Sequence, residues 1–425
     1  MSAEGAAGGL GPDVAGRVAA RVDEKRLTEL ACALVDTPSP TGSEEAMAQR
    51  VAEACEDAGL EVAWQEVEEG RPNVVGTRRG SGGGRVLMFN GHMDTSYSGD
   101  EAHLAGRPGF QPRSEVRDGR IWGLGIANMK GAIACYVEAL RAIDDAGLRL
   151  RGDVMVAAVV GEIEKSQWGS EARGAAYRGY SAGSHYLVSH GGAVADFCIL
   201  GEPTEQRIVL GHHGAMWARI STEGPFVHTA FSAGRLGENS VLRMAEVLER
   251  VRAFAPEWEA ATAYGGRPGA LNVGAVAGGH PWRASRTPSR TDLFLDLRVP
   301  PRMPMQAARA ELARFVAGLK EQLPDAGITW EVYVTSPGAE IDPGHELVGA
   351  LDSAHREVFG SAPERDTVRW SSDASVLTRY GIASVNYGAS SGLPHAEGEC
   401  VDVEALVGTA KVYALAAARI CEVER

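Results

Sequence analysis

The sequence predicts an α/β protein in which a mostly parallel sheet is interrupted by an inserted domain of ferredoxin-like α+β order. The chain has 425 residues, too many for one compact core, so two domains are expected. Strand and helix patterns alternate up to about residue 214, as they do around a parallel sheet. Between residues 215 and 335 the order becomes β-α-β-β-α-β, which is the ferredoxin-like arrangement.

The elements of the first domain follow from apolar periodicity and from breaker residues. Residues 17–35 have apolar positions at helical spacing, Pro38 and Pro40 end that helix, and Thr41-Gly-Ser-Glu-Glu is expected to open the next helix with capping oxygens. The remaining elements expected are strands at 61–66, 73–77 and 85–90, a long helix from about 130 to 146, and strands at 153–160 and 196–200. In a parallel sheet the loops that follow the strands meet at one edge, where polar motifs are expected to gather.

The second domain is expected to follow Gly214. Its predicted elements are a strand at 216–222, a helix at 238–254, strands at 270–276 and 291–298, a helix at 305–322 and a strand at 328–334. The first domain resumes near 336 and ends in an Ala-rich helix over 403–422. The predicted organisation is therefore a flexible tail at 1–16, a main domain of 17–214 with 336–425, and an insert at 215–335.

Composition limits the class of protein. A net charge of −14 and a pI near 5.3 argue against a nucleic-acid partner and against an anionic membrane surface, since both select basic patches. No apolar run approaches the roughly 20 residues that span a bilayer, and no signal peptide is recognised, so a cytoplasmic protein is expected. The six cysteines form no CxxC pair and are expected to be buried, reduced thiols.

The most informative motif is Phe-Asn-Gly-His-Met-Asp-Thr at 89–95, which follows an apolar run at 86–88. Alternate side chains of a strand point the same way, so His92 and Asp94 are expected to share a side. This is the arrangement in which a carboxylate orients a metal-binding imidazole. A histidine at a strand end is more often an ordinary hydrogen-bonded residue, so the metal prediction depends on the other motifs.

Further motifs occur along the chain in a consistent order. They are Gly-Leu-Gly-Ile-Ala-Asn-Met-Lys-Gly (123–131), Val-Val-Gly-Glu-Ile-Glu-Lys (159–165), Ile-Leu-Gly-Glu-Pro-Thr (199–204), Gly-Pro-Phe-Val-His-Thr-Ala (224–230) and Pro-His-Ala-Glu-Gly-Glu (394–399). In order and spacing they resemble the zinc-dependent peptidase and deacylase family of acetylornithine deacetylase, succinyl-diaminopimelate desuccinylase, aminoacylase-1 and carboxypeptidase G. The resemblance extends from about residue 25 to the end.

The resemblance implies a zinc-peptidase-like catalytic domain and an insert that serves for dimerisation and as a lid, so a homodimer is expected. It implies that His92 and Glu202 bind one metal ion and that Glu164 and His395 bind the other. Zinc prefers such nitrogen and oxygen donors, and catalytic sites leave one position open. By the same resemblance His228 reaches the partner subunit's site and donates to the developing oxyanion.

Two positions depart from the family pattern. Asn128 stands where the family has a bridging aspartate, and a neutral amide holds two dications less well than a carboxylate. We therefore expect at most one tightly bound divalent metal per subunit, which the resemblance implies is zinc. Alignment by Glu164 places Ile163 at the position of the general base. Glu162 lies one residue earlier and is expected to point to the opposite side of a strand unless a bulge re-aims it, so the base is either Glu162 or another residue.

Secondary candidates each have two interpretations. Arg298 in Leu-Asp-Leu-Arg meets a substrate carboxylate or forms a salt bridge within the sheet. His212 and His213, in Gly-His-His-Gly between the domains, supply extra donors or a substitute base, with His213 as a substrate contact, or they form a structural turn. Ser371, Ser372 and Asp373 precede an Ala-rich helix and are interpreted as its N-cap. They are not interpreted as a catalytic triad, because no G-x-S-x-G motif accompanies them.

Three functions are compatible with these residues. The first is a metal-dependent amidase or deacylase that acts on a small N-acyl amino acid or a short peptide. The second is acyl transfer or amide formation in the same pocket, which the loss of the water-activating base would favour. The third is a non-catalytic dimer that binds a small molecule, against which the retained ligand-type residues count. In each case the expected partner is a small molecule.

Overall fold

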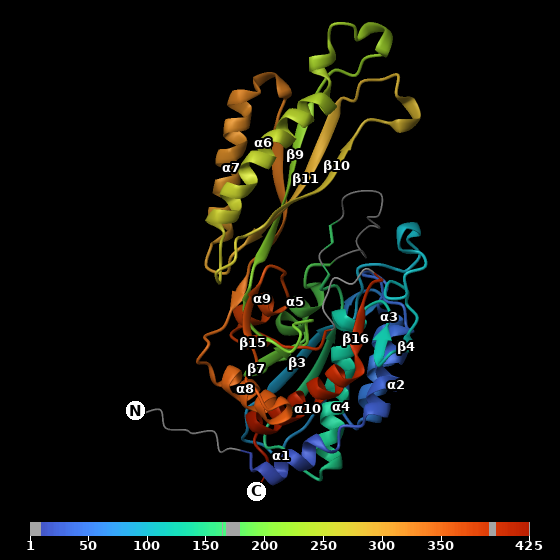
Figure 1. Cartoon of the computed structure of the whole chain (residues 1–425), viewed down its shortest axis with the longest axis vertical. Coiled ribbons are helices and arrows are strands. Elements are labelled where there is room, and N and C mark those ends of the chain that lie inside the picture. The colour runs from blue at the N-terminus through green and yellow to red at the C-terminus, as the bar shows by residue number, and fades with distance from the viewer. Residues whose placement is uncertain (1–9, 164, 167–178, 391–396, 425) are drawn as a thin grey trace. The chain divides into compact units, whose positions relative to one another are not determined.

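The structure is a computed structural model that describes residues 10–163, 165, 166, 179–390 and 397–424. It divides into two compact units, each described here by itself (Figure 1). The first unit comprises Met1–Leu210, Glu340–Asp366 and Ser372–Arg425, and the second comprises Gly211–Ala339 with Thr367–Ser371. The sequence had suggested an insert at 215–335 and contained no signal for the short segment 367–371.

The first unit is built on a nine-stranded sheet. Its path is β1 (Glu61–Glu68), β2 (Arg71–Arg78), β6 (Val154–Val159), β3 (Leu87–His92), β7 (Phe197–Leu200), β15 (Ala383–Asn386), β8 (Ile208–His212) and β13 (Ala339–Glu340), and β14 (Arg365–Val368) pairs with β8. The central run β6-β3-β7-β15 is parallel, whereas β1, β2 and β8 pair antiparallel. The expected mostly parallel sheet is therefore confirmed at the centre, where three polar motifs follow the strands.

Helices cover this sheet. They are α1 (Pro12–Ala19), α2 (Glu24–Val35), α3 (Glu45–Asp57), α4 (Gly131–Asp145), α5 (Ala182–Ser189), α8 (Glu346–Phe359), α9 (Ala374–Leu377) and α10 (Val403–Ile420). A separate small sheet has the order β16 (Cys400–Asp402), β5 (Arg120–Trp122) and β4 (Glu115–Arg117). The single helix expected over 17–35 is wrong, because the chain breaks after Ala19 and the Asp23 side chain caps α2. Thr41 does not cap α3 as expected, because its hydroxyl donates to Asp94 at 2.8 Å instead.

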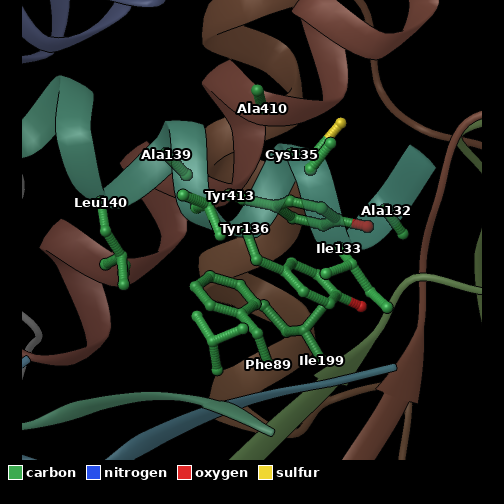
Figure 2. Packing of buried hydrophobic residues seen from close by; sticks show 14 of the residues in the cluster. Phe89, Ala132, Ile133, Cys135, Tyr136, Ala139, Leu140, Ile199, Ala410 and Tyr413 are labelled. Carbon is green, nitrogen blue, oxygen red and sulfur yellow. The ribbon is translucent and has the colours of Figure 1, made fainter. Parts of the chain in front are cut away.

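Three aromatic rings fill the space between the sheet and the helices α4 and α10 (Figure 2). The Phe89 ring stacks on Tyr136 with centroids 4.9 Å apart, and the centroids of Tyr136 and Tyr413 are 5.1 Å apart. The Tyr136 hydroxyl donates to the Asn90 carbonyl at 2.8 Å, so its polar end is satisfied inside the core. Because Phe89 and Asn90 belong to β3, this packing fixes the strand end that holds His92.

The second unit has the predicted β-α-β-β-α-β order. Its elements are β9 (Gly214–Glu223), α6 (Ser240–Ala261), β10 (Leu271–Gly278), β11 (Arg290–Val299), α7 (Met305–Gln322) and β12 (Thr329–Ser336), and the antiparallel sheet has the order β10-β11-β9-β12. Helices α6 and α7 lie side by side along it and share its core (Figure 1). Helix α6 continues past Pro256, beyond its expected end at 254, because its last turns bury Trp258 in that core. This burial offsets the helix cost of proline, about 3 kcal/mol.

All six cysteines are unpaired, and only Cys32 is not fully buried, which agrees with the expected reduced thiols. Within the part of the chain that the structure describes, no helix is long and apolar enough to cross a membrane.

Candidate active site and metal centre

Three neighbouring parallel strands bring the polar motifs of the first unit to one edge of the sheet. His92 is the last residue of β3, and β3 lies between β6 and β7. Glu162 follows the end of β6, and Glu202 follows the end of β7. Next to Glu202, a Cβ added at Gly201 would lie 2.3 Å from the Ala132 Cβ of α4, so only glycine allows this close approach.

The side chains of His92, Glu162 and Glu202 form a buried group. One donor atom from each lies within 4.8 Å of the others. His92 Nε2 lies 3.8 Å from Glu162 Oε2 and 3.0 Å from Asn128 Oδ1. An imidazole, two carboxylates and an amide oxygen are donors that suit a divalent cation such as zinc, so the residues present fit a metal ion.

Asp94 organises the surroundings of His92. Its main-chain carbonyl lies 3.0 Å from His92 Nδ1, and its Oδ1 lies 3.5 Å from the same nitrogen. Its carboxylate accepts hydrogen bonds from the Thr41 hydroxyl at 2.8 Å and from the N–H groups of Glu162 and Ile163 at 3.1 Å each. Asp94 therefore orients the imidazole and also holds the turn that presents Glu162.

Of the two orientations left open for Glu162, the structure has the re-aimed one, which faces His92. The other orientation assumed that strand alternation continues to residue 162, but β6 ends at Val159 and Gly161 has φ 62°. The turn that follows aims the Glu162 carboxylate at His92. Ile163 contributes its N–H to Asp94.

The electrostatics of this group favour a positive charge. Burial opposes a charged His92, but the hydrogen bond to Asp94 and the charges of Glu162, Asp94 and Glu202 raise its pKa well above the usual value. Burial raises the pKa of Glu162 well above its ordinary range, although His92 lowers it. Burial also raises the pKa of Glu202 to about 7, again against the effect of His92. Below about pH 7, a cation bound here would replace the proton that the Glu202 carboxyl group retains.

Asn128 belongs to a short turn, Ile126–Lys130, that precedes α4. The Glu399 Oε2 atom accepts hydrogen bonds from the N–H groups of Ala127 and Asn128, at 3.1 Å each. Sequence reasoning missed this role of Glu399. The only signal was its place as the last acid of the motif at 394–399.

Sequence reasoning also missed a role of Asp373. Asp373 is the N-cap residue of α9, as expected, but its side chain makes no cap hydrogen bond; the Ser372 hydroxyl accepts from the Ala374 N–H at 3.3 Å. Asp373 Oδ2 accepts a hydrogen bond from the Ser184 hydroxyl of α5 at 2.7 Å. The charge of Asp373 also acts on His92, Glu162 and Glu202.

The other predicted site residues fall elsewhere. Glu164 and His395 lie outside the described residues. In the second unit, His228 is half-buried at the start of a short turn, where its Nδ1 accepts from the Ala230 N–H at 3.2 Å.

The remaining two candidates also belong to the second unit and make contacts within it. The ring nitrogens of His213 lie 3.1 Å from the carbonyls of Val368 and Thr262, contacts that support the structural interpretation. Arg298 donates to Asp296 at 2.8 Å, so it forms the salt bridge within the sheet that was one of its two interpretations.

Comparison with known proteins agrees with the resemblance drawn from the motifs. The model of peptidase family M20/M25/M40 matches residues 88–419. The chain is 25% identical to N-formyl-4-amino-5-aminomethyl-2-methylpyrimidine deformylase of Bacillus subtilis, over 92% of this chain and 93% of that protein. It is 29% identical to succinyl-diaminopimelate desuccinylase of Gluconacetobacter diazotrophicus, over 91% and 94%. In fold it is similar to a tripeptidase from Staphylococcus aureus, with a TM-score of 0.72, 19% identity and coverage of 94% and 99%. The chain therefore belongs to the peptidase family M20/M25/M40, whose members are hydrolases of amide bonds that typically depend on a divalent metal.

Proposed function

We propose that this chain is a divalent-metal-dependent amidohydrolase that removes a small acyl group from an N-acyl amino acid, a short peptide or a similar small amide. The observation that carries the proposal is the buried group of His92, Glu162 and Glu202 at the sheet edge of a family M20/M25/M40 chain. Two relatives of similar length are named as a deformylase and a desuccinylase, which supports acyl removal as the reaction.

His92 and Glu202 hold the metal ion, with the amide oxygen of Asn128 beside His92 Nε2. Glu164 and His395 remain proposed ligands because they match the family pattern. Each subunit binds at most one zinc ion tightly, because Asn128 offers a neutral oxygen where a bridging charge is needed to hold two dications. When bound, the metal polarises the scissile carbonyl and lowers the pKa of water.

Glu162 acts as the general base. Its carboxylate lies 3.8 Å from His92 Nε2 and is presented by a turn that Asp94 holds. Burial raises the pKa of Glu162 well above its ordinary range, and a carboxyl group with a raised pKa is a stronger base than an ordinary one. With a carboxylate available in this place, the main argument for acyl transfer or amide formation is removed, and no observation favours a non-catalytic binder.

The enzyme assembles as a homodimer through the second unit. This unit exposes large apolar side chains, including Trp282 (78% exposed) and Phe231 (75%). The two loops that contain them are joined by a backbone bridge between His228 and Arg286, so the apolar residues belong to one local surface. A second copy of the chain covers this surface, and His228 then donates to the oxyanion in the partner's site.

The test begins with the metal. Elemental analysis of the dialysed protein is expected to give at most one zinc per subunit, and two stoichiometric zincs would contradict this number. Release of free amine is then measured with N-formyl, N-acetyl and N-succinyl amino acids and with dipeptides, before and after chelator treatment and with Zn²⁺, Mn²⁺ or Co²⁺ restored. At least one amide is expected to be hydrolysed in a metal-dependent way, and His92→Ala is the inactive control. If no substrate releases amine with any metal, the hydrolase assignment fails.

Glu162→Gln separates the role of base from that of ligand. As a base variant it is expected to retain zinc but to lose turnover by 10²-fold or more, the usual contribution of general base catalysis. Loss of zinc in proportion to turnover would show instead that Glu162 is a ligand.

A further inference from the structure

We propose that Asp373 is an outer carboxylate of the metal centre, which holds a water molecule between its free oxygen and the group of His92, Glu162 and Glu202. This inference rests on the proposed function and deepens it, because it assigns to the metal site a residue that does not itself bind the ion.

The position of the Asp373 carboxylate is fixed from the strand that holds His92. Asp373 is 1% exposed and lies directly before α9. Its Oδ2 accepts from the Ser184 hydroxyl at 2.7 Å, and the Ser184 oxygen in turn accepts from the Asn90 amide at 3.2 Å. Asn90 lies two residues before His92 in β3. One face of the carboxylate is thus tied to the same strand as the candidate ligand.

The other oxygen, Oδ1, is buried and has no hydrogen-bond partner within the described part of the chain. The side chains of Ser181 and Ser184 lower the pKa of Asp373, but neither makes a hydrogen bond to Oδ1. A buried carboxylate oxygen without a donor is costly, and in native proteins such groups are normally satisfied by protein or by ordered water. A water molecule is the smallest donor that satisfies Oδ1.

The charge of Asp373 acts on the candidate metal site. In addition to burial, it raises the pKa of both Glu162 and Glu202. With Asp94, four buried acids therefore act on one imidazole, and without a cation the repulsion between their charges is relieved only where a carboxyl group takes up a proton. A dication relieves this repulsion, and carboxylates just outside the ligand shell raise metal affinity in the same way in other sites.

A purely structural role for Asp373 predicts a different change in apoprotein stability from the role proposed here. If the carboxylate mainly joins α9 to α5 through Ser184, removing its charge should lower stability without changing metal affinity. If repulsion dominates, removing the charge should leave the apoprotein as stable as before or more stable, and metal affinity should fall. The two roles therefore differ in the sign of a measurable quantity.

The experiment compares wild type, Asp373→Asn and Ser372→Ala, each freed of metal by chelator. Zn²⁺ affinity is measured by competition with a chromophoric chelator, and the melting temperature of each apoprotein by circular dichroism. Asp373→Asn, which preserves side-chain shape, is expected to bind Zn²⁺ at least tenfold more weakly, with an unchanged or higher apoprotein melting temperature. Ser372→Ala removes the hydroxyl that caps α9 and is expected to retain wild-type Zn²⁺ affinity.

A change in Zn²⁺ affinity of less than tenfold in Asp373→Asn overturns the proposal. A weaker affinity together with a lower apoprotein melting temperature also overturns it, because the carboxylate would then act through the fold. If Asp373→Asn does not fold, Ser184→Ala replaces it: freeing Oδ2 is expected to weaken Zn²⁺ binding at least threefold, and a smaller effect overturns the proposal. A wild type that binds no Zn²⁺ would instead count against the proposed function itself.

Discussion

The neutral side chain of Asn128 limits the negative charge of the candidate metal centre. Its Oδ1 lies 3.0 Å from His92 Nε2, so the side chain is already in place to contact a cation. Asn128→Asp adds the missing charge without changing side-chain shape. We expect at least a tenfold higher zinc affinity and more than one zinc per subunit after dialysis.

The matched control for this change is Asn239→Asp. It adds the same charge in the second unit at the N-cap of α6, where the Asn239 side chain accepts from the Val241 N–H and aspartate caps equally well. If Asn128→Asp leaves zinc content at the wild-type level, the bridging charge is not what limits the site.

The pH dependence of apoprotein stability follows from Glu202. Burial raises its folded-state pKa from 4.5 to about 7. A carboxyl group with a raised pKa stabilises the fold fully below its unfolded pKa, and this contribution is lost as the pH rises through about 7. The free energy of unfolding should therefore fall between pH 5 and 7.5, by up to about 3 kcal/mol. Glu202→Gln does not titrate and should show a smaller fall.

Urea unfolding of both apoproteins at the two pH values measures this difference. Saturating Zn²⁺ should remove the fall in wild type, because the ion takes the place of the proton. Equal pH dependence in wild type and Glu202→Gln would show that Glu202 does not titrate in this range.

Among the elements, the turn Ile126–Lys130 depends on an acid from the far end of the chain. Glu399 accepts from two N–H groups of this turn, next to Asn128. Glu399→Ala leaves both donors without an acceptor, which should cost about 1–3 kcal/mol of stability. Zinc affinity should fall by about tenfold, since supporting hydrogen bonds tune ligand position.

Two variants test whether the acceptor oxygen is responsible. Glu399→Gln retains one acceptor oxygen and should stay close to wild type in chelator competition and urea unfolding. Glu397→Ala changes an exposed acid of the same segment that pairs with Arg117, and it should have little effect on either measurement. Equal losses in Glu399→Gln and Glu399→Ala would point to charge rather than hydrogen bonding.

At the scale of the whole molecule, the apolar surface of the second unit should govern assembly. Phe231→Asp places a charge in the proposed interface and should convert the dimer to a folded monomer. The control Trp64→Asp alters another exposed aromatic residue, in β1 of the first unit, and should stay dimeric. Mass by light scattering together with circular dichroism distinguishes the outcomes. A Phe231→Asp dimer of normal mass would place the interface elsewhere.

Sharing of the active site between subunits is tested with a mixed dimer. One subunit has His228→Ala and the other His92→Ala, so a shared arrangement leaves one site intact and the other with both lesions. About half of wild-type activity is then expected, provided that both parent variants are inactive. Complete inactivity of confirmed mixed dimers would mean that His228 serves its own subunit.

The order of the elements and the strand ends that hold His92 and Glu202 could be read from the sequence. Both depend on local patterns, because side-chain periodicity distinguishes helix from strand and parallel strands align their carboxyl ends. The second unit followed its predicted order for the same reason. The neutral Asn128 within the motif at 123–131 was also visible, since it requires only the register of a motif.

Tertiary structure was needed for Glu162, Asp373 and Glu399. Glu162 follows a turn with a positive φ at Gly161, where strand alternation no longer applies. Asp373 and Glu399 act on groups far away in sequence, through Ser184 and through the turn at Asn128. Such contacts depend on how distant segments pack, and a local pattern contains no information about its distant partner. The sequence therefore determines which residues end the strands, whereas packing determines which buried acids surround them.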